Sequence, residues 1–161
     1  MSTLTDKFFQ AINISDDEAV QELIDQGADV NAVSNNIDDP YNKDLTPLLV
    51  AIRGRSIHIA KILIEAGADV NLTGKRGLPP IHMAFIHNQR DILEILLEHG
   101  ANENSKDRRG RTLWQAFSDD SPYKRACFKI VDEHVIKRER EQLEAAVVQP
   151  SSEQTTRKQK I

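Results

Sequence analysis

The sequence predicts an all-α repeat solenoid, and three observations lead to this prediction. First, a five-residue motif recurs: Gly67-Ala68-Asp69-Val70-Asn71 returns 33 residues later as Gly100-Ala101-Asn102-Glu103-Asn104, and Gly27-Ala28-Asp29-Val30-Asn31 precedes it by 40. Second, the apolar residues between these motifs are three and four residues apart, which is the period of a helix. Third, prolines and glycines recur where helices begin and end. Such fixed-period similarity is typical of stacked repeats.

Each copy of the repeat is expected to contain two short helices. Pro47 and Pro80 stand at the first turn of the first helix, and a glycine such as Gly67 follows the second helix. Helices this short cannot bury their apolar faces alone, so the copies must stack. In the second copy, the residues expected to face the core are Leu48, Ala51 and Ile52 in the first helix and Ile59, Ile62 and Leu63 in the second.

The repeat spacing also sets the expected domain boundaries. One domain should span residues 1–148, and the polar segment 149–161, which has no aromatic residue, should be disordered. The extra seven residues between the first two copies predict an insertion at 34–43. Ile37 and Tyr41 are candidate contact residues there, although a tolerated surface-loop insertion is an equal alternative. The repeats are placed at about 4–33, 44–73, 77–106 and 110–142.

The fourth copy departs from the pattern. It begins with Asp107 to Thr112, but Leu113 then stands where the other copies have proline. Ser121-Pro122 is a favourable helix start, and Cys127, Ile130 and Val131 share one face of the helix that should follow. We therefore expect a modified repeat that ends in a C-terminal capping helix at 121–148. Its charged end is expected to be solvated, with docking to a partner helix as the alternative.

At this point the residues resemble a known family. Thr46-Pro47-Leu48 with Ala51, Pro80-Ile81-His82 with Ala84, and the three Gly-Ala-Asp/Asn cores look like ankyrin repeats over roughly residues 4–142. The resemblance implies an L-shaped stack with helices on one side and β-hairpin fingers projecting at right angles. It also implies that His82 hydrogen-bonds the backbone of a neighbouring loop.

The same resemblance bears on two asparagines in the Asp-Val-Asn segments. Asn31 and Asn71 resemble substrates of an asparaginyl hydroxylase of animal cells, although their default role is hydrogen bonding in the hairpin turns. The source of the chain decides whether it meets such an enzyme. Hydroxylation is therefore left open at this stage.

Composition excludes several classes of protein. The 161 residues include 21 Lys and Arg against 25 Asp and Glu, a net charge of −4, which gives no whole-chain argument for nucleic acid. The longest apolar run, 48–52, is far too short to span a membrane. Asp6 and Lys7 interrupt any signal peptide. The expected location is intracellular and cytoplasmic, or the host cytosol for a secreted bacterial effector.

No pattern in the sequence indicates catalysis. There is no phosphate-binding glycine loop, and no two histidines are spaced i, i+4 as a helical zinc site requires. The single cysteine, Cys127, lies on an apolar stripe, and Trp114 occupies the position of Leu48, so both are expected in the core. We predict a non-enzyme with no catalytic residues, no cofactor, no metal site and no small-molecule substrate.

In ankyrin repeats the fingers and the inner edge of the first helices commonly meet partners. Of thirteen exposed positions mapped by this analogy, seven are Lys or Arg and none is acidic. A basic surface of this kind would attract an acidic protein partner. The alternative is ordinary surface charge, partly neutralised by Asp38, Asp39 and Asp44. The predicted partner-binding residues are Lys43, Arg53, Lys75, Arg76, Ile86, His87, Arg108, Arg109 and Arg111.

The sequence thus predicts a monomeric, non-catalytic module for protein–protein interaction, acting as an adaptor, inhibitor or effector. The first alternative is an assembly subunit that docks through its C-terminal helix. A less favoured alternative is nucleic-acid binding, because the basic positions lack the aromatic side chains on which bases stack.

Overall fold

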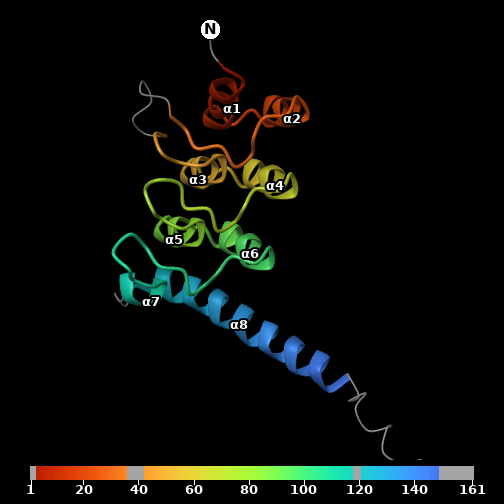
Figure 1. Cartoon of the computed structure of the whole chain (residues 1–161). Coiled ribbons are helices and arrows are strands. Elements are labelled where there is room, and N and C mark those ends of the chain that lie inside the picture. Colours follow the sequence, from red (N-terminus) through yellow and green to blue (C-terminus); the bar gives the residue numbers. More distant parts are fainter. Residues whose placement is uncertain (1–2, 36–41, 118–120, 149–161) are drawn as a thin grey trace, which may run out of the picture. The chain divides into compact units, whose positions relative to one another are not determined.

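A computed structural model describes residues 3–35, 42–117 and 121–148 of the chain (Figure 1). Contacts along the chain divide it into two compact units, Met1–Val131 and Asp132–Ile161. The expected disordered tail, most of the expected insertion, and its candidate residues Ile37 and Tyr41 lie outside the described residues.

Six helices of the first unit form three pairs, each joined by a short turn. The pairs are α1 (Leu4–Asn13) with α2 (Asp17–Asp25), α3 (Pro47–Arg53) with α4 (Ile57–Glu65), and α5 (Pro80–Ile86) with α6 (Arg90–Glu98). The first helices α1, α3 and α5 pack on one another in one layer, and the second helices α2, α4 and α6 form the other (Figure 1). The predicted helical repeat solenoid is therefore confirmed.

The core lies between these two layers because each helix turns its apolar stripe inward. Of the six core positions predicted in the second repeat, five are buried, and Ile62 alone is half-buried. The third repeat matches this pattern, since five of the equivalent positions are buried and Ile95, the counterpart of Ile62, is half-buried. Fully buried large side chains along the stack include Phe8, Leu48, Ile52, Ile59, Leu63, Ile81, Phe85, Leu93, Leu96 and Leu97.

The helix ends follow the predicted capping chemistry. The hydroxyl of Thr46 accepts a hydrogen bond from the backbone N–H of Leu49 at 3.3 Å, and Pro47 occupies the first turn of α3. Gly27, Gly67 and Gly100 follow the second helices with φ of +88°, +92° and +85°. This left-handed conformation strains every residue with a Cβ, so the recurring glycine is explained by geometry.

The expected β-hairpin fingers are not confirmed. The described parts of the three connecting loops, 26–46, 66–79 and 99–112, contain turns and bends without a β-strand. Side chains compete for the backbone groups that a strand ladder would use. The carboxylate of Asp29, for example, accepts from the backbone N–H of Asn31, and that of Asp69 from the N–H of Asn71, both at 2.8 Å.

The fourth copy is reduced, as its sequence suggests. Its first helix, α7 (Leu113–Ala116), has four residues, and α8 (Pro122–Val148) begins at the predicted proline. Leu113 is fully buried, whereas Trp114 is 38% exposed, so the expected core position of Trp114 was wrong. Leu113 takes the buried place, and Trp114, on the next helical position, instead stacks on Phe128 with ring centroids 4.4 Å apart.

Candidate partner-binding surface

Two asparagines hold the connecting loops in register. The side-chain oxygen of Asn31 accepts from the backbone N–H of Asp69 at 2.8 Å, and its amide donates to the carbonyl of Gly67 at 3.3 Å. Asn71 makes the same pair of bonds to the third repeat, to Asn102 at 2.8 Å and Gly100 at 3.1 Å. These side-chain bonds reach the next repeat, and within its own turn each asparagine contributes its backbone N–H, which donates to Asp29 or Asp69.

Three predicted basic residues meet where the first and second connecting loops touch. The backbone N–H of Lys75 donates to the carbonyl of Asp44 at 3.0 Å, and its ammonium donates to Asn35 at 2.9 Å. The same ammonium lies 3.7 Å from the Asp44 carboxylate. Arg76 donates from Nε to the carbonyl of Lys43 at 3.0 Å. The ammonium of Lys75 and the guanidinium of Arg76 are therefore both held against the first connecting loop, and Asp44 partly balances the charge of Lys75.

This close approach of the two loops depends on Gly74. A Cβ at that position would lie 2.4 Å from the carbonyl oxygen of Asp44, and the φ of Gly74 is +60°. No other residue type fits both conditions without moving the backbone. The second loop also lies against the third, because a Cβ on Gly77 would contact the side chain of Arg108 at 3.5 Å.

Asp107 organises the third loop. Its Oδ1 accepts from the backbone N–H groups of Arg109 and Arg111, and its Oδ2 accepts from Nε and Nη2 of Arg111 at 3.0 and 2.8 Å. The backbone N–H of Arg111 is the main reason that the pKa of Asp107 lies below its usual value. Arg108 and Arg109 are exposed, and their side chains have no hydrogen bond or ion pair with another described residue.

The remaining predicted residues lie at the C-terminal ends of α3 and α5. Arg53 donates from Nη2 to the side chain of Asn42, a buried residue that in turn donates to Asn13 at 2.8 Å. Ile86 is 46% exposed. Burial, and then the nearby cations Arg55 and Arg53, lower the pKa of His87. The structure thus divides the predicted residues into a connecting-loop group and a helix-end group.

Sequence reasoning missed Arg55 at this helix end. Arg55 follows Gly54 in the turn between α3 and α4 with φ of +60°, and Ser15 and Asn88 occupy the same place in their repeats. The repeat offsets align these three residues, but no two of them are alike. Only the fold shows that they share a left-handed turn.

The side chains considered for chemistry have structural partners. Nε2 of His82 donates to the carbonyl of Ser105 at 2.9 Å, which confirms the expected contact with a neighbouring loop, and burial lowers the pKa of His82. Cys127 is buried as predicted and donates from Sγ to Asn88 at 3.3 Å. Burial raises the pKa of its thiol, which disfavours the reactive thiolate.

A family model described as ankyrin repeats, in three copies, matches residues 8–107, more than half of the 161. The chain belongs to the ankyrin-repeat family. The matched region ends before α7, so it covers the three regular ankyrin repeats and leaves out the reduced fourth copy. A comparison with curated proteins finds no match to the chain.

Ankyrin repeats are generally modules for protein–protein interaction and are typically not enzymes. Within residues 3–35, 42–117 and 121–148, no three His, Cys, Asp or Glu side chains are grouped as a metal site requires. None of the helices in these same ranges is both long enough and apolar enough to cross a membrane.

Proposed function

We propose that this ankyrin-repeat protein is a non-catalytic adaptor, inhibitor or effector that binds an acidic surface of a protein partner. The basic surface is the proposed contact. It comprises Lys43, Lys75, Arg76, Arg108, Arg109 and Arg111 of the connecting loops together with Arg53, Ile86 and His87 at the helix ends.

The observation that carries this proposal is the state of Arg108 and Arg109. Both side chains are exposed and unpaired among the described residues, next to a loop that already concentrates Lys75 and Arg76. Unpaired guanidinium groups suit bidentate contacts to carboxylates. On the exposed faces of the second helices acidic side chains outnumber the cations Lys61 and Arg90; they include Glu22, Asp25, Glu65, Asp91, Glu94 and Glu98. This separation of charge supports electrostatic steering of an acidic partner.

Within this surface, Arg111 has a structural role and a binding role. Its bond to Asp107 fixes the turn that presents Arg108 and Arg109, while 41% of its side chain stays exposed to a partner. His87 contributes an uncharged ring at neutral pH, because its pKa is lowered. The proposed contact therefore combines cations of the connecting loops with an uncharged ring and an exposed apolar residue, Ile86, at the helix ends.

The test is the double variant Arg108→Glu/Arg109→Glu, which leaves the Arg111–Asp107 bond intact. Partners would be captured from a cell lysate, identified by mass spectrometry, and then purified for affinity measurement. The double variant should weaken binding at least about tenfold, equivalent to about 1.4 kcal/mol. The matched control, Lys7→Glu/Lys61→Glu, makes the same change of charge on exposed residues of α1 and α4 and should bind like the wild type. Equal binding by all three proteins would contradict the proposal.

A second candidate function rests on the C-terminal helix. Ile136, Leu143 and Val147 of α8 are 50%, 67% and 83% exposed, and their spacing places them near one face of the helix. An assembly subunit docking a partner helix on this face is the second proposal. Truncation after residue 135 should abolish such binding and leave binding by Arg108 and Arg109 unchanged. Binding that survives truncation would contradict this alternative.

We also propose that residues 1–148 form one domain in which the first part of α8 caps the repeats. Cys127 and Val131 are fully buried, and Phe128 contacts Phe85 of α5 at a centroid distance of 4.6 Å. Limited proteolysis tests this boundary, because it should remove residues beyond 148 first. Cleavage inside α8 before any loss of the tail would contradict it.

A further inference from the structure

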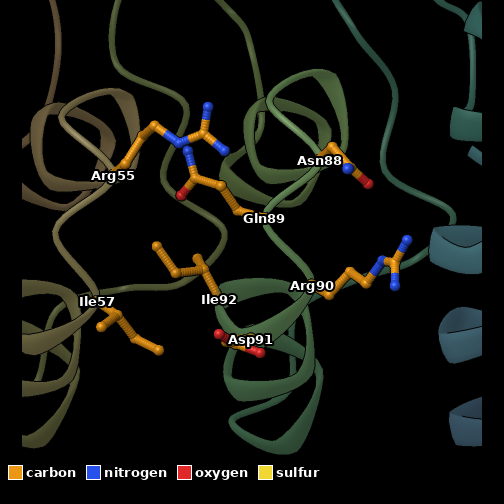
Figure 2. Close-up of a pocket in the computed structure, with 7 residues that line it drawn as sticks. All are labelled: Arg55, Ile57, Asn88, Gln89, Arg90, Asp91 and Ile92. Atoms are coloured by element: carbon orange, nitrogen blue, oxygen red, sulfur yellow. The ribbon is translucent and has the colours of Figure 1, made fainter. Parts of the chain in front are cut away.

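A pocket of about 400 Å³ lies where the second and third repeats meet at their helix–helix turns (Figure 2). It is formed by the turn after α3, the first residue of α4, and the start of α6. It shares no residue with the basic surface proposed above. Its walls combine apolar Ile57 and Ile92 with polar Arg55, Gln89 and Asp91.

Gln89 presents an unsatisfied acceptor to this pocket. The side chain is 8% exposed, and its amide donates to the carbonyl of Ile52 at 2.6 Å. Its carbonyl oxygen, Oε1, is buried and has no hydrogen-bond partner among the described residues. In Figure 2 this oxygen faces the space between Arg55 and Ile57. Buried polar atoms are nearly always paired, so this oxygen is suited to accept from an N–H or O–H donor of a ligand.

The start of α6 presents the complementary groups, backbone donors without a side-chain cap. Gln89 is its N-cap residue but makes no side-chain cap, whereas Asp16 at the start of α2 accepts from the N–H of Ala19 at 3.0 Å. The first N–H groups of α6 therefore lack a side-chain acceptor, and the helix dipole favours an anion beside them. Arg55 adds a guanidinium without a hydrogen bond or ion pair to another described residue.

We propose that this pocket binds an aspartate of a peptide segment from a protein partner. The carboxylate accepts hydrogen bonds from the first N–H groups of α6 and from Arg55. The backbone N–H of the same segment donates to Oε1 of Gln89. A free inorganic anion satisfies only the first of these two needs. Asp91 and Arg90, which also line the pocket, have opposite charges, so Arg55 gives the site its positive balance.

Titration of the full chain with a defined probe tests the site. The probe is acetyl-Gly-Asp-Gly-amide, followed through the backbone amide resonances of Arg90, Asp91 and Ile92. We expect saturable shifts at millimolar concentrations. Acetyl-Gly-Asn-Gly-amide, which lacks the charge, should bind about tenfold more weakly. Acetate, which lacks the N–H, should also bind more weakly than the aspartyl peptide. The absence of shifts at these three amides would overturn the proposal.

Variants separate the two halves of the site. Arg55→Gln should weaken the aspartyl peptide about threefold to tenfold, and the control Lys61→Gln, which removes one charge from the exposed face of α4, should not. Gln89→Met should weaken the peptide but leave acetate unchanged, with circular dichroism confirming the fold. Equal affinity for acetate and the peptide in every protein would show an anion site without peptide recognition. The Arg108→Glu/Arg109→Glu protein should bind the peptide normally, so this proposal and the proposed function fail independently.

Discussion

The junction between the second and third repeats and the junction after the third repeat are held together in different ways. At the first, Asn71 makes two hydrogen bonds to the backbone of the third repeat. At the second, the side-chain amide of the equivalent Asn104 donates, among the described residues, only to the neighbouring Glu103, at 3.4 Å. Aromatic rings hold this junction in place of the two hydrogen bonds, since Phe85 stacks on Phe117 with centroids 5.0 Å apart and also contacts Phe128.

This difference explains why the fourth copy tolerates a degenerate sequence. A pair of hydrogen bonds of this kind needs a Gly-Ala-Asp or Gly-Ala-Asn turn in the next copy, and the fourth copy has neither. Aromatic packing needs only ring area and is less demanding of backbone geometry. The regular repeats are therefore joined by hydrogen bonds from an asparagine side chain to the backbone of the next repeat, and these bonds recur along the stack. The last junction is joined by contacts between aromatic side chains.

The largest expected effect comes from removing the central ring of the last junction. Phe85 is 1% exposed and contacts two other rings, so Phe85→Ala should lower the free energy of unfolding by about 3–5 kcal/mol. Urea denaturation followed by circular dichroism measures this change. The neighbouring Ile86→Ala, at an exposed position, is the control and should cost under about 1 kcal/mol. Similar losses for both variants would show that the aromatic cluster is not what holds this junction.

The next largest effect on the free energy of unfolding is expected from removing the two hydrogen bonds of Asn71. Asn71→Ala removes the exposed hydrogen bonds to the carbonyl of Gly100 and the N–H of Asn102, and should cost about 0.5–1.5 kcal/mol because water can reach both groups. Asn104→Ala is the matched change at a position whose side chain makes no hydrogen bond to a following repeat, and it should cost under about 0.5 kcal/mol. Both are measured by urea denaturation. An equal cost at the two positions would remove the distinction between the junctions.

The regular repeats were largely predictable from the sequence, and the last junction was not. Periodicity and capping residues are local signals, so the helices and the glycine stops followed from them, whereas the loop contact of His82 followed from the resemblance to ankyrin repeats. The exposed Trp114 and the pairing of Arg111 with Asp107 depend on neighbours that only the fold supplies. Asp107 and Arg111 are four residues apart, but they lie in a loop, where this spacing does not by itself bring two side chains together. The unsatisfied oxygen of Gln89 likewise depends on its contact with Ile52.

The two junctions should also differ in their response to acid. Burial lowers the pKa of His82, so the folded protein binds fewer protons at this ring than the unfolded chain, whose histidine titrates near 6.5. The contribution of His82 to the free energy of unfolding is fully present above about pH 6.5 and is lost as the pH falls toward the lowered pKa. His82→Gln keeps a donor for Ser105 and should show a shallower loss of stability between about pH 7 and 5. Identical pH slopes for the two proteins would show that protonation of His82 does not weaken the last junction.

The smallest expected effect concerns the turns within the repeats, where the second repeat differs from the third. The side chain of Arg55, at φ of +60°, makes no hydrogen bond or ion pair with another described residue, whereas the side chain of Asn88, at +52°, accepts from Cys127. A left-handed conformation strains arginine more than asparagine, and glycine not at all. Arg55→Gly should therefore raise the free energy of unfolding by about 0.5–1 kcal/mol. Asn88→Gly, which relieves less strain and loses a hydrogen bond, should give no gain. Urea denaturation measures both, and a gain at Asn88 equal to that at Arg55 would show that the side-chain contact of Asn88 adds nothing to the last junction.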